Sequence, residues 1–473
     1  MTKHSPLRLD RRSFLKKSGA SCLTAAAAGG LTSSLSMFPA HAANVDGYRA
    51  LVCVFFLGGM DNFDTLLPFD QSSYDRYAQI RSTMVAQHGG SRDRSNLLQL
   101  SPDTTSGFNG REFALPPQLS GLHTLFQQGD LAIVDNVGPL IEPVTKEQAL
   151  TGSRPLPPRL FSHNDQQSVW QSNRPEGAQF GWGGLFADAA VASGANSSGS
   201  ANVFTTITSE GSQLFLTGDR TRPYQVAGEE GVKVDLLEFF DDRDSPAFDI
   251  LTRHFRASDF SGSNLIERDI AAAMEGSFDA NNLFNEAVEN RVPLTTQFPQ
   301  SFLGSQLQSV AQTISLRDVM LVNRQVFFVA IGGFDTHDDQ ASDLPGLHTQ
   351  INDAFVAFNA AMQEIGAQND VTLFTASEFG RTLAINGDGT DHGWGGTQFV
   401  MGGAVNGREI YGTVPVHDFD HEYDVGGGRL LPSTSVEQFA EPLGNWFGLT
   451  DAELAAALPN LPNFANGTIP LFG

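Results

Sequence analysis

Continuous apolar runs of six to eight residues recur along this chain, and each of them ends in glycine or in a polar cluster. Residues 50–57 and 326–331 are each followed by two glycines, and 371–376 is followed by Ser377-Glu378. Unbroken apolar runs are typical of central strands covered on both faces, whereas half-exposed strands alternate apolar and polar residues. Stretches with helical periodicity lie between the runs. The pattern therefore predicts an α/β fold with a mainly parallel sheet and helices on both faces.

The remaining elements follow from hydrophobic period and from start and stop signals. We expect strands at 131–136, 202–208 and 397–402, and helices near 73–84, 117–128, 164–172, 181–193, 343–367 and 434–447, with more helices across 233–290 and 299–322. The stretches 88–116 and 139–160, rich in Gly, Ser, Pro and Arg, are interpreted as long surface loops near the active face. Residues 209–300 are interpreted as a helical insertion or cap. No internal repeat is present, and 43–473 is expected to form one large domain.

Acidic and imidazole side chains follow the strands at the points where the strands end. Asp61, Asp335, His337 and Glu378 come after three apolar runs, and His392 follows within an Asp-His-Gly turn. Glycines at strand ends let the chain turn sharply, and ligands of open α/β sheets bind beyond the carboxyl ends of the strands. Carboxylates and imidazoles suit divalent ions. The sequence thus predicts a site for one or two ions of Zn, Mn, Mg or Ca.

Three further residues are candidates for chemistry. Ser162 lies at or near the N-cap of the helix predicted at 164–172, where its hydroxyl could simply cap the helix. It could instead be a nucleophile, and His163 a ligand or acid/base, at a helix end that stabilises developing negative charge. Arg381 could hold an anionic substrate group or pair with an acid of its own chain. Six other histidines of the mature chain are assigned no role: His88, His123, His254, His348, His417 and His421.

The N-terminus indicates export. Arg11-Arg12 lies in a twin-arginine signal, a modestly apolar stretch follows at 20–37, and Ala40-His41-Ala42 is a small-x-small cleavage site. The apolar stretch is short and interrupted by Gly and Ser, so we expect no stable membrane span once the signal is removed. The signal peptide is therefore assigned to residues 1–42, and the mature protein to the periplasm or the exterior.

Charge and cysteine content narrow the possible partners. Loss of residues 1–42 removes six basic residues and one acidic residue, which changes the net charge from −24 to −29. So acidic a protein is a poor partner for nucleic acid. Of the two cysteines, Cys22 lies in the signal and Cys53 in the first strand. An internal disulfide is excluded, and Cys53 is expected to pack as a small apolar residue.

Five short motifs behind a twin-arginine signal give the chain a family resemblance. They are Gly58-Gly59-x-Asp61, Phe161-Ser162-His163-x-x-x-Gln167, Gly333-Phe334-Asp335-Thr336-His337, Ser377-Glu378-Phe379-Gly380-Arg381 and Thr390-Asp391-His392-Gly393. As a set they resemble the exported bacterial family called domain of unknown function 1501. The resemblance covers almost the whole mature chain.

That family in turn resembles the alkaline phosphatase and sulfatase superfamily. The resemblance implies metal-dependent hydrolysis of phosphate or sulfate esters, with a small molecule or a glycan carrying the anionic ester, and with Ser162 or a water molecule at the metal as nucleophile. Glu378 stands where the superfamily has Asp, and Phe379 stands where it has a metal-binding His. The alternative is a non-catalytic exported protein that keeps the fold and binds a glycan, an anion or a partner.

Replacing Arg11 and Arg12 by Lys is expected to leave an uncleaved precursor in the cytoplasm. The twin-arginine export receptor recognises the arginine pair itself, so two lysines of the same charge do not replace it. Cell fractionation with immunoblotting measures the outcome. Mature protein outside the inner membrane at the normal level would contradict this route.

Overall fold

The computed structural model describes residues 47–196, 202–209, 214–227, 230–231, 245–255, 265–464 and 469–473. The predicted signal peptide lies outside these ranges, so its cleavage and the export route stay predictions. The described part of the chain contains no helix long and apolar enough to cross a bilayer.

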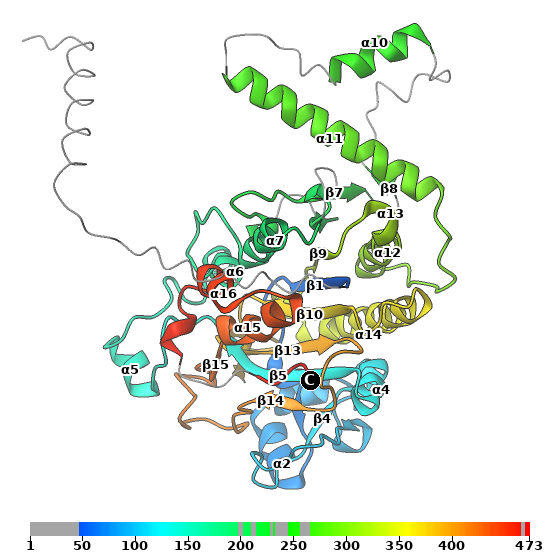
Figure 1. Cartoon of the computed structure of the whole chain (residues 1–473). Coiled ribbons are helices and arrows are strands. Elements are labelled where there is room, and N and C mark those ends of the chain that lie inside the picture. Colours follow the sequence, from blue (N-terminus) through cyan, green and yellow to red (C-terminus); the bar gives the residue numbers. More distant parts are fainter. Residues whose placement is uncertain are drawn as a thin grey trace, which may run out of the picture. The chain divides into compact units, whose positions relative to one another are not determined.

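Within the described residues, a ten-stranded sheet forms the centre of the structure (Figure 1). Its strand order is β14-β5-β13-β10-β1-β9-β6-β7-β8, and β15 also pairs with β5. Only β13 and β8 run against the common direction. The strands are β1 Arg49–Phe56, β5 Leu131–Gly138, β6 Thr206–Thr208, β7 Tyr224–Ala227, β8 Glu230–Gly231, β9 Arg324–Ile331, β10 Val371–Ser377, β13 Gly396–Met401, β14 Ile410–Gly412 and β15 Thr434–Ser435. The predicted α/β class with a mainly parallel sheet is confirmed.

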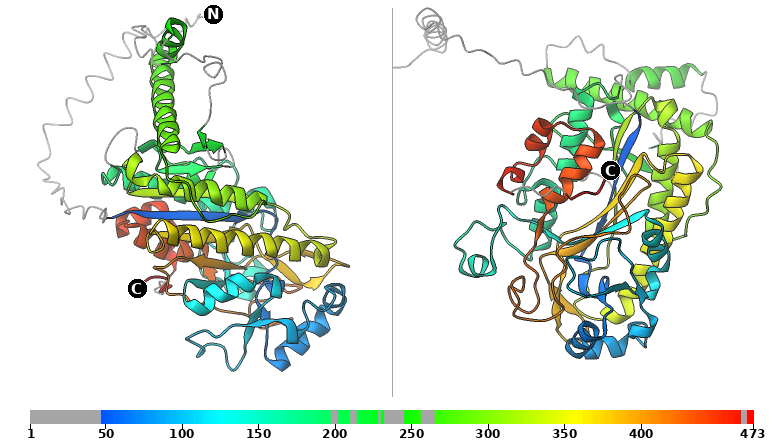
Figure 2. Two further views of the ribbon diagram at one scale, coloured as in Figure 1. Left: turned by 90° about the vertical axis from the view of Figure 1, so that its right-hand side faces the viewer. Right: turned by 60° about the horizontal axis from the view of Figure 1, so that its bottom comes forward.

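Helices cover both faces of this sheet (Figure 2). On one face pack α4 Ser120–Gln128, α12 Phe302–Ser315, α14 Gln340–Glu364 and the C-terminal part of α11 Leu265–Glu289, where Ala280, Phe284 and Ala287 are buried. On the other face pack α6 His163–Ser172, α7 Trp182–Ala192, α15 Val436–Phe447 and α16 Asp451–Ala457. The first strand shows why its sequence is apolar throughout, since Val52 and Val54 enter the first core and Cys53 and Phe55 enter the second. Cys53 is a buried free thiol, as expected.

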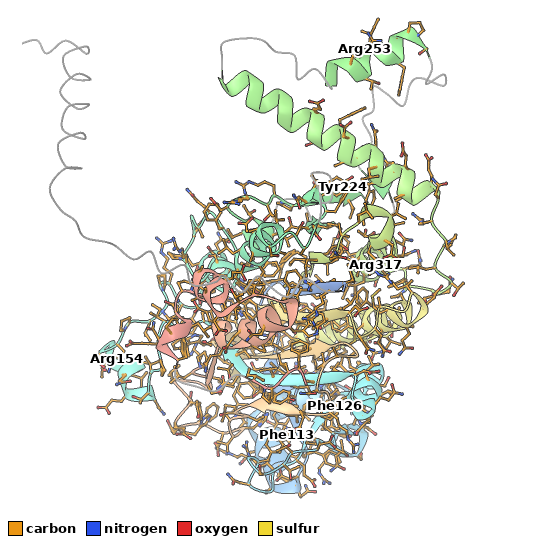
Figure 3. The ribbon with its side chains drawn as sticks, viewed as in Figure 1. Phe113, Phe126, Arg154, Tyr224, Arg253 and Arg317 are labelled. Carbon is orange, nitrogen blue, oxygen red and sulfur yellow. The ribbon has the colours of Figure 1, made fainter. Side chains whose placement is uncertain are left out.

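Smaller elements complete the described chain. A three-stranded sheet comprises β2 Leu67–Pro68, β4 Phe113–Leu115 and β3 Leu98–Gln99, and a two-stranded sheet comprises β11 Arg381–Ile385 and β12 Thr390–His392. The short helices are α2 Gln71–Ile80, α3 Ser82–Gln87, α5 Lys146–Thr151, α10 Pro246–Phe255 and α13 Arg317–Met320. Phe113 and Phe126, both labelled in Figure 3, belong to the first core.

Most predicted elements match in type and place, but three expectations need correction. The stretch 88–116 contains β3 and β4, and the stretch 139–160 contains α5, near which Arg154 pairs with Glu142 at 3.2 Å (Figure 3). The strand predicted at 202–208 is shorter in the structure, because only the residues of β6, Thr206–Thr208, pair with β9. Residues 209–300 include β7 and β8, which extend the main sheet, as well as α10 and α11. The segment therefore contains strands as well as helices, and its interpretation as a helical insertion or cap is not confirmed.

Four buried titratable groups act on stability in opposite directions. Burial lowers the pKa of His348 and of His417 to about 3, so the folded protein holds both imidazoles neutral. Their stabilisation is present above the unfolded pKa near 6.5 and is lost as the pH falls toward 3. Burial raises the pKa of Asp135 and of Glu437 to about 7. Those carboxyls make the folded state take up protons, so their stabilisation is lost as the pH rises through 7.

Single substitutions should expose this balance between pH 4.5 and 6.5. As the pH falls, the free energy of unfolding of His417→Gln is expected to increase relative to that of the wild type, because the variant lacks the imidazole whose burial opposes protonation. The free energy of unfolding of Asp135→Asn is expected to decrease relative to that of the wild type, because the variant lacks the carboxyl that takes up a proton on folding. Each slope changes by at most about 1.4 kcal/mol per pH unit, because one group exchanges one proton. Urea unfolding at several pH values measures the slopes. Identical slopes in both variants and the wild type would contradict the assignment.

Candidate metal centre

Three strands of the sheet end at one level, and this register assembles the site. Phe56 of β1 pairs with Ile331 of β9 on one side and with Ser377 of β10 on the other. The loops that follow meet at Gly58, whose N–H donates to Glu378 Oε1 at 2.8 Å and whose carbonyl accepts from an arginine. Gly58 has φ +119°, and a Cβ there would lie 2.2 Å from the backbone nitrogen of Asp335. Only glycine permits this approach.

The Asp335 carboxylate is the centre of a histidine cluster. His337 Nε2 and His392 Nε2 each lie 3.1 Å from its Oδ1, and His163 Nε2 lies 3.3 Å from its Oδ2. Arg381 Nη1 donates to Oδ1 at 3.0 Å. Burial opposes ionisation of Asp335, but the hydrogen bond from Arg381 and the positive charge of its guanidinium help to outweigh it and lower the pKa of this carboxyl. The cluster thus forms around a charged carboxylate.

The hydrogen bonds at the far side of two imidazoles define their tautomers. His392 Nδ1 lies 2.7 Å from the carbonyl oxygen of Phe161, and His163 Nδ1 lies 2.9 Å from Glu378 Oε1. Both partners are acceptors, so each Nδ1 carries the proton and each neutral ring directs an Nε2 lone pair at Asp335. A lone pair facing a carboxylate oxygen is repulsive unless a proton or a cation lies between them, and His337 Nε2, 2.9 Å from His392 Nε2, can share a proton with that lone pair. Such carboxylate–histidine pairs orient imidazoles toward metals in proteins.

The two imidazoles differ in the direction of their pKa shifts, and therefore in how strongly a proton would compete with a cation for Nε2. The hydrogen bond that His163 donates to Glu378 raises the pKa of His163, so a proton competes for its Nε2. Burial lowers the pKa of His392, which keeps this ring neutral. One ligand atom from each of His163, Asp335 and His392 lies within 4.8 Å of the others, a spacing that fits a shared ion. The residues present therefore fit a divalent metal.

Glu378 reaches the cluster through His163 rather than directly. Its buried Oε1 accepts from Gly58 N, from His163 Nδ1 and, at 3.1 Å, from Gln167 Nε2. Among the described residues its buried Oε2 has no hydrogen-bond partner. The sequence predicts Glu378 as a ligand, whereas the structure places it behind His163, whose ring it holds. Gln167 lies one helical turn after His163, a spacing that could have indicated the shared face.

Asp61 does not join the cluster, which corrects the expectation that all five strand-end residues converge. Asp61 is buried at the N-cap of a 3-10 helix, Asn62–Asp64, and accepts from Phe63 N at 2.9 Å. Arg81 binds both carboxylate oxygens, at 2.7 and 3.2 Å. Gln340 also donates to Asp61 and accepts from Thr390 Oγ1 at 2.7 Å. A buried guanidinium therefore already neutralises Asp61.

Arg381 follows the pairing alternative. It is buried, donates to Asp335 and to the carbonyl of Gly58, and donates through Nη2 to the carbonyl of Thr390 at 2.6 Å. The pairing of Arg381 with His392 across β11 and β12 brings it to this place. Its contacts hold Asp335 in position and leave it turned away from solvent.

Ser162 occupies the N-cap position of α6, but its hydroxyl makes no capping hydrogen bond. Its Oγ donates instead to Asp165 Oδ2 at 2.9 Å. The preceding Phe161 has φ +72°, a conformation rare for a bulky residue, and its carbonyl faces His392. The capping interpretation is thus wrong in its usual form, and Ser162 directly precedes His163 of the cluster.

Comparison with known proteins adds the family. A model described as "Protein of unknown function (DUF1501)" matches residues 48–458. The chain belongs to the DUF1501 family. The match spans every residue of the cluster in this DUF1501 protein, and it confirms the resemblance inferred from the motifs. No curated protein matches the sequence.

Solved structures offer only weak likenesses to this DUF1501 protein. "Crystal structure of Ps i-CgsB in complex with k-i-k-neocarrahexaose" and "Crystal structure of Ps i-CgsB" align at 9% and 8% identity, each with a TM-score of 0.32. Each alignment covers 88% of this chain and 77% of the other. Likenesses at this level carry no argument, and they give no support to the alkaline phosphatase and sulfatase resemblance.

The role of Gly58 can be tested with a matched glycine. Gly58→Ala is expected to displace Asp335 and to destabilise the protein by about 1–3 kcal/mol, because alanine is strained at this φ and its Cβ collides with the next loop. Gly332→Ala is the control, since a Cβ at Gly332 meets nothing within 4 Å. Zinc and manganese titration calorimetry and urea unfolding measure both effects. Wild-type stability and metal affinity in Gly58→Ala would contradict the assembly described.

Proposed function

We propose that this DUF1501 protein is an exported metal-dependent hydrolase of phosphate or sulfate esters. The observation that supports the proposal is the pair of imidazole lone pairs, from His163 and His392, directed at the Asp335 carboxylate. Imidazole nitrogens with one carboxylate are ligands that suit Zn²⁺, Mn²⁺ and Fe²⁺. His337 adds a third imidazole, which lies at the same carboxylate oxygen, Oδ1, as His392.

The geometry favours one ion rather than two. A second ion would need Asp61, whose oxygens are occupied by Arg81 and Gln340. Phe379 contributes no ligand atom, and its ring stacks on His392 with centroids 4.5 Å apart. The supported centre therefore consists of His163, Asp335, His337 and His392.

The exposure of the cluster favours catalysis over a structural role. The side chains of Asp335 and His337 are 46% and 42% exposed, although Arg381 beneath them is buried. Structural zinc sites are closed by protein ligands, whereas catalytic sites keep a position open. A divalent ion held here would polarise an ester oxygen and lower the pKa of a nearby water.

The chain's own residues would support such a reaction in distinct ways. Arg381 neutralises Asp335, so the centre stays electron-poor and suits an anionic substrate. Glu378 orients His163, and the carbonyl of Phe161 orients His392. The nucleophile is either a water molecule or Ser162, whose hydroxyl proton already faces the carboxylate of Asp165.

A non-catalytic exported binding protein is the second candidate. Phe379 favours it, because this apolar ring packs against His163 and His392 where one more ligand would complete a fuller metal site. Such a protein would keep the ion as an anchor for a glycan or an anion without turning it over.

His392→Ala should separate these proposals from a protein without a metal. It removes a ligand nitrogen near the surface, so bound metal and ester hydrolysis are expected to fall together while the melting temperature stays near that of the wild type. His123→Ala is the control, since His123 is half-buried in α4 and contacts the backbone carbonyl of Gln99. Metal analysis of the folded protein and a panel of phosphatase and sulfatase substrates provide the readouts. A wild type that binds no metal would overturn the metal centre, and one that binds metal without turnover would favour the binding protein.

Ser162→Ala tests the nucleophile. If Ser162 attacks the ester, turnover is lost while bound metal is retained, because the hydroxyl holds no position in the cluster. If water attacks, turnover persists at a similar rate. Steady-state rates together with metal content decide between the two.

A further inference from the structure

The buried arginines nearest the cluster cannot recognise a substrate. Arg381 is committed to Asp335, to Gly58 and to Thr390, and Arg81 is committed to Asp61 and to the carbonyls of Leu383 and Thr382. Neither side chain is exposed. An anionic substrate that approaches the cluster from solvent needs a different cation.

Arg429 is a partly exposed arginine at the rim of the cluster. Its Nε donates to the carbonyl of His392 at 3.0 Å, and its Nη1 donates to the carbonyl of Gly426 at 3.1 Å. Its guanidinium lies over the ring of Phe161, 5.6 Å from the centroid. Two hydrogen bonds and one aromatic face therefore fix the orientation of a guanidinium whose side chain is 31% exposed.

The remaining nitrogen of Arg429 is left available. Nη2 lies 3.8 Å from Asp391 Oδ2, too far for a hydrogen bond, and the described residues offer it no closer acceptor. The Asp391 carboxylate is bound on its other oxygen, since Asn386 Nδ2 donates to Oδ1 at 2.7 Å. Arg429 thus presents an unused donor beside His392.

The loop that carries Arg429 is rigid before any ligand arrives. The buried carboxylate of Asp424 accepts the N–H groups of Gly426 and Gly428 through one oxygen, each at 2.8 Å, and Val425 N donates to the carbonyl of Arg429. These hydrogen bonds outweigh burial and lower the pKa of Asp424, so the anchor stays ionised. An arginine placed in advance loses less entropy when it binds an anion.

We infer that Arg429 binds the anionic oxygens of the substrate beside the metal centre. The inference rests on the proposed function and deepens it, because it assigns the recognition of a phosphate or sulfate group to Arg429 in place of Arg381. A guanidinium binds the negatively charged oxygens of a phosphate or sulfate group, and a neutral ester has no such charged oxygens. The substrate class is accordingly an ester that keeps a negative charge at the reacting group.

The test compares Arg429→Gln and Arg429→Lys with Arg159→Gln as the matched control. Arg159 is another exposed arginine near α6, with its side chain 72% exposed and 3.4 Å from Asp165. Zinc affinity is measured first, and orthophosphate and sulfate are then titrated into the zinc-loaded proteins by calorimetry. Arg429→Gln is expected to weaken anion binding by at least about tenfold with zinc affinity unchanged, Arg429→Lys to restore part of it, and Arg159→Gln to match the wild type. On an anionic ester, Arg429→Gln should raise KM more than it lowers kcat.

The outcomes separate the two proposals. A wild type that binds no zinc removes the proposed function, and anion titration of the zinc-free wild type against Arg429→Gln still decides the role of Arg429. Equal anion affinities in these proteins, or a loss confined to Arg159→Gln, would overturn the assignment. Loss of zinc together with the anion in both Arg429 variants would make Arg429 a positioning residue for His392, which also overturns it.

Discussion

The in-register pairing of β1 with β9 and β10 is the constraint from which the site follows. Since all three strands end at one level, the loops after them must turn within a few ångströms of one another. Gly58 makes that crowding possible, because its missing side chain leaves room for the backbone of Asp335 while its N–H binds Glu378. The acid of one loop and the histidine held by another are thereby brought to a common point before any ligand binds.

Behind this point lies a layer of buried charge that supports the loops. Arg81 pairs with Asp61, and Arg92 pairs with Asp64. Burying ions is costly, and loss of one partner from such a pair typically destabilises a protein by about 3–5 kcal/mol, so these contacts strongly restrict where the loops can lie. Gln340 joins the layer to the β12 side through Asp61 and Thr390. These buried ion pairs explain why Asp61 has a structural role, whereas Asp335 faces solvent.

The division of labour among the arginines has the same physical origin. A buried arginine must satisfy its donors with protein acceptors, so Arg381 holds Asp335 and the backbone around it. A rim arginine can leave a donor to solvent without a comparable cost, so Arg429 keeps one nitrogen for an approaching anion. Arg381 and Arg429 both lie near the proposed metal, so the difference in their burial decides their roles.

The sequence alone determined the central strands, the class of the fold and most members of the histidine cluster. Apolar runs and the turns after them are local, and strand ends in a parallel sheet share an edge, so Asp335, His337 and His392 could be found from pattern. The tertiary structure decided which partner each polar group meets. Asp61 had the right residue type and place, but Arg81, twenty positions away, packs against it. Neither the tautomers of His163 and His392 nor the free nitrogen of Arg429 could be predicted, because they depend on distances between loops remote in sequence.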